Sequence, residues 1–180
     1  MNLILQAAKW AQEAHKDQVR KYNGRLFIEH PMRVAGWVSL MRDQQPEYVA
    51  AAWLHDVKED QWKYWLKIEA QLPGSVRIIV DQLTNPSKKY PELNRKLRKK
   101  MDREHLAKCA DCTKVIKMID RYDNLCGMDE CPDDFKYIYA DESLLLAQAV
   151  RPVLFDVDLT PWCNAVDQAA NQILSSTKAA

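Results

Sequence analysis

The residues most able to do chemistry stand together at 51–60, in the stretch AAWLHDVKED. Small apolar residues lead into His55 and Asp56, and each is followed four residues later by an acid, Glu59 and Asp60. Residues four apart share a helix face, so we expect a compact patch of one imidazole and three carboxylates. A divalent cation relieves the repulsion among such carboxylates, and a His and Asp ligand set suits manganese, iron or zinc. The alternative is a helix cap followed by a solvated acidic turn.

Two further polar residues interrupt apolar sequence in the same way. His30 follows Phe27 and Ile28 at the start of a predicted helix, and its alternative interpretation is a structural histidine. Asp120 ends the apolar run of VIKMID, and Asn124 follows four residues later on the same helix face. The alternative for Asp120 is a buried carboxylate paired with a basic residue.

The ordered set of these motifs resembles the HD-domain metal-dependent phosphohydrolases. Within that family the chain is similar to the hydrolase domain of RelA/SpoT-type alarmone enzymes and their small stand-alone relatives. The resemblance covers about residues 1–150. It is carried by an Arg-Lys pair, a segment ending in His-Pro, the HDxxED box and an acidic residue with a following Asn, which appear here in that order as Arg20-Lys21, FIEHP, HDVKED and IDRYDN.

The resemblance implies one metal ion, usually manganese, although other transition metals are possible. Its ligands would be His30, His55, Asp56 and Asp120. A metal held in this way lowers the pKa of a water molecule, so that hydroxide becomes available near neutral pH.

The resemblance also implies roles for five other residues. Glu59 and Asp60 would position the attacking water and transfer protons as general acid and base. Arg20 and Lys21 would bind the phosphates of the substrate, and Asn124 would contact the substrate or its ribose. The implied reaction removes pyrophosphate from the 3′ position of guanosine tetra- or pentaphosphate, or of adenosine analogues.

The chain departs from the family pattern at a few positions near these motifs. Phe27 stands where tyrosine is usual, Asp123 precedes the Asn, Cys126 stands where an arginine is usual, and Lys58 lies inside the HDxxED box. These changes leave open an HD-type phosphohydrolase or nucleotidase for another nucleotide, including reduced dinucleotide phosphate. A non-catalytic nucleotide-binding module is a further alternative, but it predicts a lost ligand or acid, and all are present.

A basic cluster lies between the HDxxED box and the Asp120 segment. It consists of Lys88, Lys89, Arg95, Lys96, Arg98, Lys99 and Lys100. A solvated helix face explains it, and so does a rim that attracts a polyphosphate ligand. The net charge of +1 and the lack of a recognition motif argue against a nucleic-acid partner.

The elements that must position these residues are helices, because apolar residues recur at helical spacing and no run alternates as a strand does. We therefore predict an all-α, single-domain HD-type fold over residues 1–180, in which a C-terminal helix closes the core. The predicted helices cover about 3–15, 31–41, 46–57, 62–72, 75–84, 92–109, 111–127, 132–150 and 161–176.

The cellular setting follows from what the sequence contains. No stretch reaches the roughly 18 apolar residues of a membrane span, and the N-terminus is charged too early for a signal peptide. The five cysteines are an odd number, which favours reduced thiols, and Cys109 with Cys112 is a lone CxxC pair without the second pair of a zinc ribbon. We expect a cytoplasmic enzyme with a small nucleotide substrate and no membrane partner.

Overall fold

The computed structural model describes residues 2–43, 45–152, 156 and 158–177. Within these residues all regular secondary structure is helical, apart from one isolated β-bridge between Val19 and Leu26. The prediction of an all-α fold is confirmed. No helix in the described chain has the length and apolarity needed to cross a membrane.

The chain divides into two compact helical units, Met1–Asn85 and Pro86–Ala180. The single domain predicted over residues 1–180 stays a prediction.

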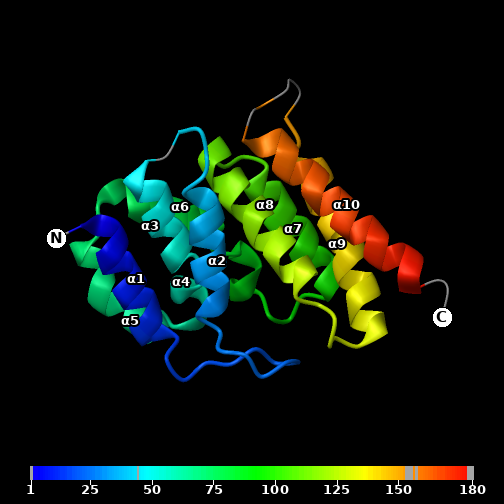
Figure 1. Cartoon of the computed structure of the whole chain (residues 1–180), viewed down its shortest axis with the longest axis horizontal. Helices are drawn as coiled ribbons and strands as arrows, with labels where there is room; N and C mark the ends of the chain where they lie inside the picture. Colours follow the sequence, from blue (N-terminus) through cyan, green and yellow to red (C-terminus); the bar gives the residue numbers. More distant parts are fainter. Residues whose placement is uncertain (1, 44, 153–155, 157, 178–180) are drawn as a thin grey trace. The chain divides into compact units, whose positions relative to one another are not determined.

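The first unit is built around α3 (Pro46–Leu54), which packs against α1 (Leu3–Ala14), α2 (Glu29–Val38) and α6 (Gly74–Leu83) (Figure 1). Most of α3 is buried and its alanines at 50, 51 and 52 are fully inaccessible, because small residues let neighbouring helices approach closely. The short elements α4 (Val57–Asp60), α5 (Trp62–Ile68) and η1 (Glu69–Gln71) connect α3 to α6.

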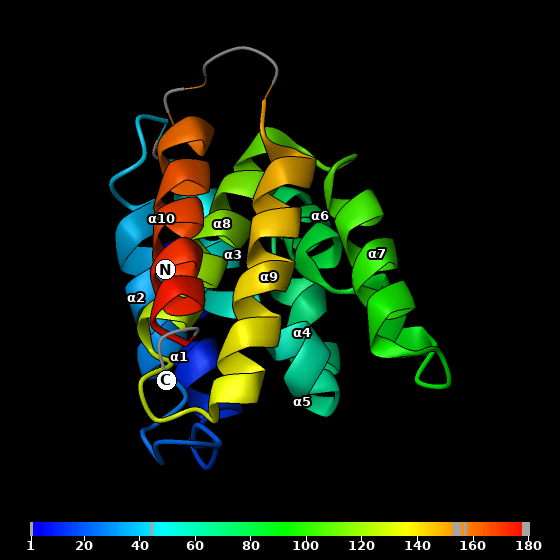
Figure 2. The ribbon, with the colours of Figure 1, turned by 90° about the vertical axis from the view of Figure 1, so that its right-hand side faces the viewer.

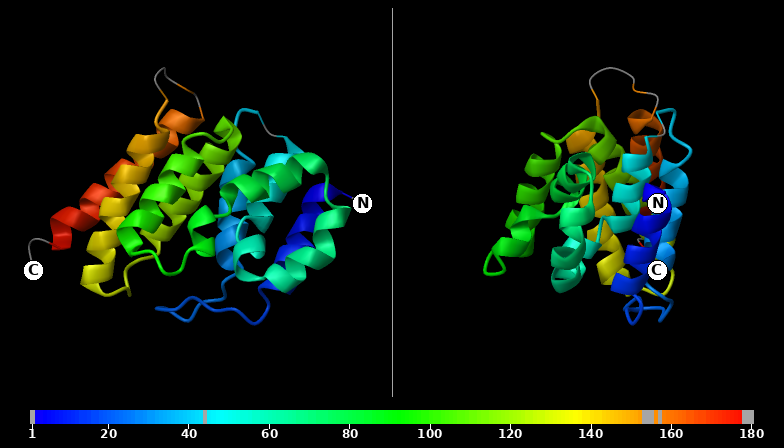
Figure 3. Two further views of the ribbon diagram at one scale, coloured as in Figure 1. Left: turned by 180° about the vertical axis from the view of Figure 1, so that it is seen from behind. Right: turned by 90° about the vertical axis from the view of Figure 1, so that its left-hand side faces the viewer.

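The second unit contains η2 (Pro86–Lys89), α7 (Arg95–Leu106), α8 (Asp111–Cys126), α9 (Asp133–Val150) and α10 (Leu159–Thr177). Helices α8, α9 and α10 pack against one another, and α9 and α10 run antiparallel (Figures 1 and 3). Helix α7 packs against α9 and η2 (Figure 2). Apolar residues of α8 fill this core, with Ile116, Met118 and Ile119 fully buried.

Two helix boundaries differ from the sequence prediction for identifiable reasons. The helix predicted from residue 92 begins at Arg95, because the Asn94 side chain accepts a hydrogen bond from the Leu97 amide at 3.0 Å and caps it. The helix predicted from residue 161 begins at Leu159, whose amide donates to the Asp156 side chain at 2.6 Å. In each case a short polar side chain satisfies an orphan amide of the first turn.

The prediction of a continuous helix over 46–57 was wrong at its C-terminal end. Helix α3 ends at Leu54, and a turn at His55 and Asp56 leads into α4. The Nδ1–H of His55 donates to the Ala52 carbonyl at 2.7 Å, so the histidine side chain satisfies a carbonyl of the last helical turn. Two predicted site residues therefore lie at a helix junction and not in the middle of a helix.

Candidate active site

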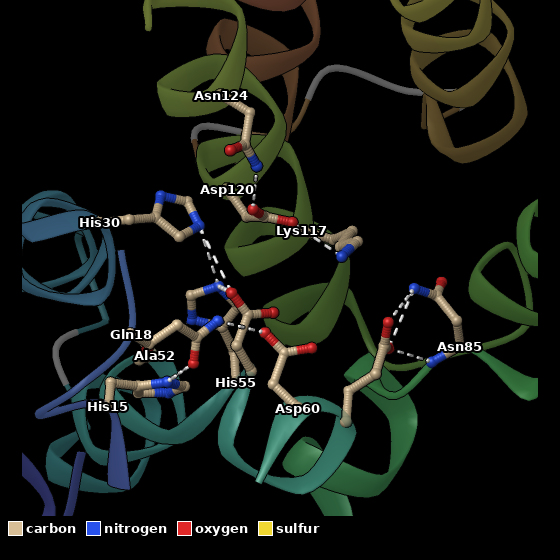
Figure 4. Close-up of polar contacts among 12 residues, drawn as sticks. His15, Gln18, His30, Ala52, His55, Asp60, Asn85, Lys117, Asp120 and Asn124 are labelled. Atoms are coloured by element: carbon tan, nitrogen blue, oxygen red, sulfur yellow. Dashed lines mark hydrogen bonds and ion pairs between the residues drawn. The ribbon is translucent and has the colours of Figure 1, made fainter. Parts of the chain in front are cut away.

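Three predicted metal ligands meet in the first unit. His30 comes from the first turn of α2, and His55 and Asp56 come from the turn after α3. Their ligand atoms lie within 4.8 Å of one another, and the two imidazoles are buried. The two rings are nearly perpendicular, with an interplanar angle of 76°, and Figure 4 shows a nitrogen of each pointing toward the other. Among the described residues, these three are the one group of histidines, cysteines or acids whose spacing suits a metal ion.

The contact distances within this cluster show what it can bind. The Nε2 atoms of His30 and His55 are 3.2 Å apart, and Asp56 Oδ2 lies 3.1 Å from His55 Nε2 and 3.7 Å from His30 Nε2. Because Nδ1 of His55 donates to the Ala52 carbonyl, the lone pair of the neutral ring is on Nε2. The two ring nitrogens and the carboxylate are close enough to coordinate one divalent ion, which would relieve the repulsion among their lone pairs. The donor set therefore fits a metal.

Glu59 and Asp60 have other hydrogen-bond partners within the first unit. The Asn85 backbone amide and its side-chain Nδ2 each donate to Glu59 Oε2 at 3.0 Å. Gln18 Nε2 donates to Asp60 Oδ2 at 3.0 Å. The metal-spaced group, which consists of His30, His55 and Asp56, thus contains one carboxylate. A continuous helix would have brought three carboxylates together.

Gln18 connects Asp60 to a buried histidine that sequence reasoning missed. Its Oε1 accepts hydrogen bonds from His15 Nδ1 at 2.8 Å and from Gln61 Nε2 at 3.0 Å. His15 is 1% exposed, and burial lowers its pKa below the ordinary value of 6.5. A polar residue at the end of the apolar face of α1 was the signal that could have identified it.

Arg20 and Lys21 lie on a short loop between α1 and α2. The loop is closed by the Phe27 amide, which donates to the Gln18 carbonyl at 2.9 Å, and it turns at Gly24, whose φ is 65°. The Arg20 guanidinium lies 5.6 Å from the centroid of the Phe27 ring, and Lys21 Nζ lies 5.0 Å from that of Tyr22. The aromatic residue at position 27 also packs against the His15 and His30 rings.

Asp120 and Asn124 lie on α8 in the second unit. Asn124 Nδ2 donates to Asp120 Oδ1 at 2.7 Å, which confirms that they share a helix face. Asp120 Oδ2 pairs with Lys117 Nζ at 2.7 Å, and the carboxylate is buried (Figure 4). The ion pair that the alternative interpretation of Asp120 required is therefore present, and the role of Asp120 as a ligand stays a prediction.

The His-Asp cluster, the family model and the named relatives together assign the chain to the metal-dependent phosphohydrolases. The chain belongs to the HD domain family, whose model matches residues 7–146. The matched range contains every predicted site residue from Arg20 to Asn124.

Relatives with assigned names support this family assignment. A protein of Xenopus tropicalis named guanosine-3′,5′-bis(diphosphate) 3′-pyrophosphohydrolase MESH1 is 34% identical over 131 residues, which is 72% of this chain and 71% of that protein. The protein of the same name from Danio rerio is 29% identical over the same shares. A Synechocystis protein named as a probable guanosine-3′,5′-bis(diphosphate) 3′-pyrophosphohydrolase is 33% identical over 71% of this chain, which is 17% of that protein.

A solved structure confirms the fold. It is described as "A metazoan ortholog of SpoT hydrolyzes ppGpp and plays a role in starvation responses". The similarity has a TM-score of 0.75 and covers 97% of each chain at 22% sequence identity.

Proposed function

We propose that this protein is a manganese-dependent small alarmone hydrolase that removes pyrophosphate from the 3′ position of guanosine tetra- or pentaphosphate or of adenosine analogues. The observation that carries the proposal is the 34% identity over 131 residues to a named 3′-pyrophosphohydrolase. The His30, His55 and Asp56 cluster supports it, because a divalent ion bound there would act as a Lewis acid in such a hydrolysis.

The proposed metal ligands are His30, His55, Asp56 and Asp120. The first three have the spacing and the donor atoms for a divalent ion, whereas the membership of Asp120 rests on the family resemblance. A divalent ion bound there would lower the pKa of water, which makes a nucleophile available at neutral pH. The donor set suits manganese, iron or zinc, and manganese is the proposed ion because the resembled family usually uses it.

Glu59 and Asp60 are the proposed general acid and base. Each carboxylate accepts hydrogen bonds from amide groups, Glu59 from Asn85 and Asp60 from Gln18. These neutral amide donors hold each carboxylate in a fixed orientation without pairing it with a cation. Both residues would then orient water and transfer protons to and from the reacting oxygens.

Arg20, Lys21 and Asn124 are the proposed substrate-binding residues. The guanidinium of Arg20 offers two parallel N–H donors to a phosphate, and Lys21 offers a compact charge. The loop closed at Phe27 holds Arg20 beside an aromatic ring, which limits the orientations that its side chain samples. Asn124 would contact the substrate or its ribose.

The proposal includes the cytoplasm as the compartment and no nucleic-acid partner. All five cysteines are free thiols, as a reducing compartment favours. Fractionation of cells that express the tagged full-length chain would test the compartment.

The decisive experiment measures pyrophosphate release from guanosine tetraphosphate with added manganese. We expect release by the wild type, and a loss of about 10²-fold or more in Asp56→Ala and Glu59→Ala. Glu13→Gln is the matched control, because Glu13 is an exposed acid paired with Lys16. Absence of release from a manganese-bound wild type would contradict the proposed substrate.

A further inference from the structure

A pocket of about 430 Å³ lies between α7 and α9 of the second unit, and none of the proposed catalytic residues is among the residues that line it. One wall is a stripe of cations on α7, formed by Arg95, Lys96, Lys99 and Arg103. Positions 95, 99 and 103 are each four residues apart, so their side chains share one helix face. Part of the basic cluster noted in the sequence is therefore gathered in a concave surface.

The positive charge of this wall is only partly compensated. Arg95 donates to both oxygens of Glu142, at 2.6 and 2.9 Å. Among the described residues, no carboxylate lies within ion-pair distance of the side chains of Lys96, Lys99 or Arg103. Burial, followed by the nearby Arg121, lowers the pKa of Lys99, so an anion beside this ammonium group would stabilise its charged form.

Arg121 adds a second, independent sign of uncompensated charge. Its side chain is 8% exposed, and its Nε and Nη1 atoms have no hydrogen-bond partner within the described chain. The guanidinium lies 4.4 Å from the centroid of the Tyr139 ring on α9. Buried guanidinium groups are normally paired, so its presence beside Lys99 raises the local attraction for an anion.

The opposite wall of the pocket is apolar and aromatic. It is formed by Tyr137, Ile138 and Leu145 of α9, whose side chains are 43%, 44% and 41% exposed. Asp141 lies on the same wall and offers a hydrogen-bond acceptor. A ligand for this pocket therefore combines a flat apolar body with several negative charges, and the volume suits a small molecule.

We propose that this pocket binds a nucleoside polyphosphate. The phosphates would lie on Lys96, Lys99 and Arg103, and the base would pack on Tyr137 and Ile138. The inference does not rest on the proposed hydrolase function, because none of these side chains belongs to the predicted catalytic set.

The test uses NMR spectra of the full-length chain titrated with GTP in the presence of EDTA, which prevents metal-dependent hydrolysis. We expect saturable shifts of backbone amides in α7 and α9. Inorganic tripolyphosphate is expected to bind at least about tenfold more weakly than GTP, because it has no base to pack on Tyr137, and guanosine more weakly still. Absence of GTP-dependent shifts in α7 and α9, or equal affinity for tripolyphosphate, would overturn the assignment.

Two variants and a charge-matched control complete the test. The double variant Lys99→Gln, Arg103→Gln should lose at least about tenfold in GTP affinity at this pocket. Tyr137→Ala, at an exposed position where folding is little affected, should also weaken GTP but leave tripolyphosphate unchanged. Lys100→Gln, Lys108→Gln removes the same charge outside the pocket and should bind like the wild type. An equal loss of GTP affinity in this control would show that the overall charge of the protein causes the effect, and it would refute a specific site.

Discussion

At the scale of single residues, the turn after α3 decides which carboxylate of the HDxxED box lies beside the imidazoles. His55 closes the end of α3 through the Ala52 carbonyl, and Asp56 then lies 3.1 Å from the His55 ring. Glu59 and Asp60 follow on α4 and hydrogen-bond to Asn85 and Gln18. Within the HDxxED box, Asp56 therefore lies next to the imidazoles, whereas Glu59 and Asp60 are held by amide groups. This separation is consistent with the proposed roles of Asp56 in metal binding and of Glu59 and Asp60 in proton transfer.

Gln18 is predicted to be a positioning residue for Asp60. Gln18→Ala removes the donor to Asp60 and the acceptor for His15 and Gln61. We expect the kcat of the proposed hydrolysis to fall about tenfold or more, because a lost hydrogen bond to a charged group costs about 1.5–3 kcal/mol. The measurement is steady-state kinetics over a pH series, since a displaced Asp60 would also move the pH profile.

Gln12→Ala is the matched control for this prediction. Gln12 lies on α1 close to Gln18 in sequence, but its side chain is exposed. The role of Gln18 would be ruled out if both variants kept the wild-type kcat and pH profile.

His15 is predicted to make stability depend on pH. Burial holds its pKa below 6.5, and its Nε2 has no hydrogen-bond partner in the described chain, so the folded state favours the neutral ring. The unfolded chain takes up the proton first, so this contribution is present above about pH 6.5 and is lost as the pH falls toward the folded pKa.

The free energy of unfolding measured from about pH 7.5 to about pH 5.5 checks this sign. The decrease should be smaller in His15→Gln than in the wild type. A decrease of the same size in both proteins would show that other groups account for it.

At the scale of elements, α3 and α2 respond to added methyl groups in opposite directions. Ala51 of α3 is fully buried, so Ala51→Leu inserts atoms into packed space and should cost about 1–3 kcal/mol. Gly36 of α2 has a helical backbone, and a Cβ placed on it meets no atom within 4 Å. Gly36→Ala should therefore add about 0.5–1 kcal/mol of stability.

Chemical denaturation of the two variants and the wild type measures both changes in the free energy of unfolding. The midpoint should fall for Ala51→Leu and rise for Gly36→Ala, with similar slopes in both transitions. A stable Ala51→Leu variant would mean that the contacts of α3 with α1, α2 and α6 are looser than its burial indicates.

At the scale of the whole molecule, a bound metal should stabilise the folded chain. An ion that binds only the folded state at about 100 times its Kd adds about 2.7 kcal/mol. We expect manganese to raise the Tm of the wild type, and Asp56→Asn to abolish that increase, because Asp56 is the carboxylate of the metal-spaced group.

Asp120→Asn extends the same measurement to the fourth predicted ligand. A reduced response to manganese would support Asp120 as a ligand. An unchanged response would assign Asp120 to the ion pair with Lys117 and the hydrogen bond with Asn124 alone.

The sequence by itself determined the helical class, the family and the identity of the clustered histidines and aspartate. These follow from local order: helical spacing of apolar residues, and His30, His55 and Asp56 in family motifs. The face shared by Asp120 and Asn124 was also predictable, since both lie on one uninterrupted helix.

Only the tertiary structure decided the partners of these residues. That Gln18 reaches Asp60, 42 positions away, and that Asn85 reaches Glu59, 26 positions away, depends on helix packing that no local pattern encodes. The same holds for the break at His55, where a side-chain bond to Ala52 ends a helix that apolar spacing continues. The pocket between α7 and α9 likewise exists because two helices distant in sequence pack together, which turns a basic stripe into one wall of a concave surface.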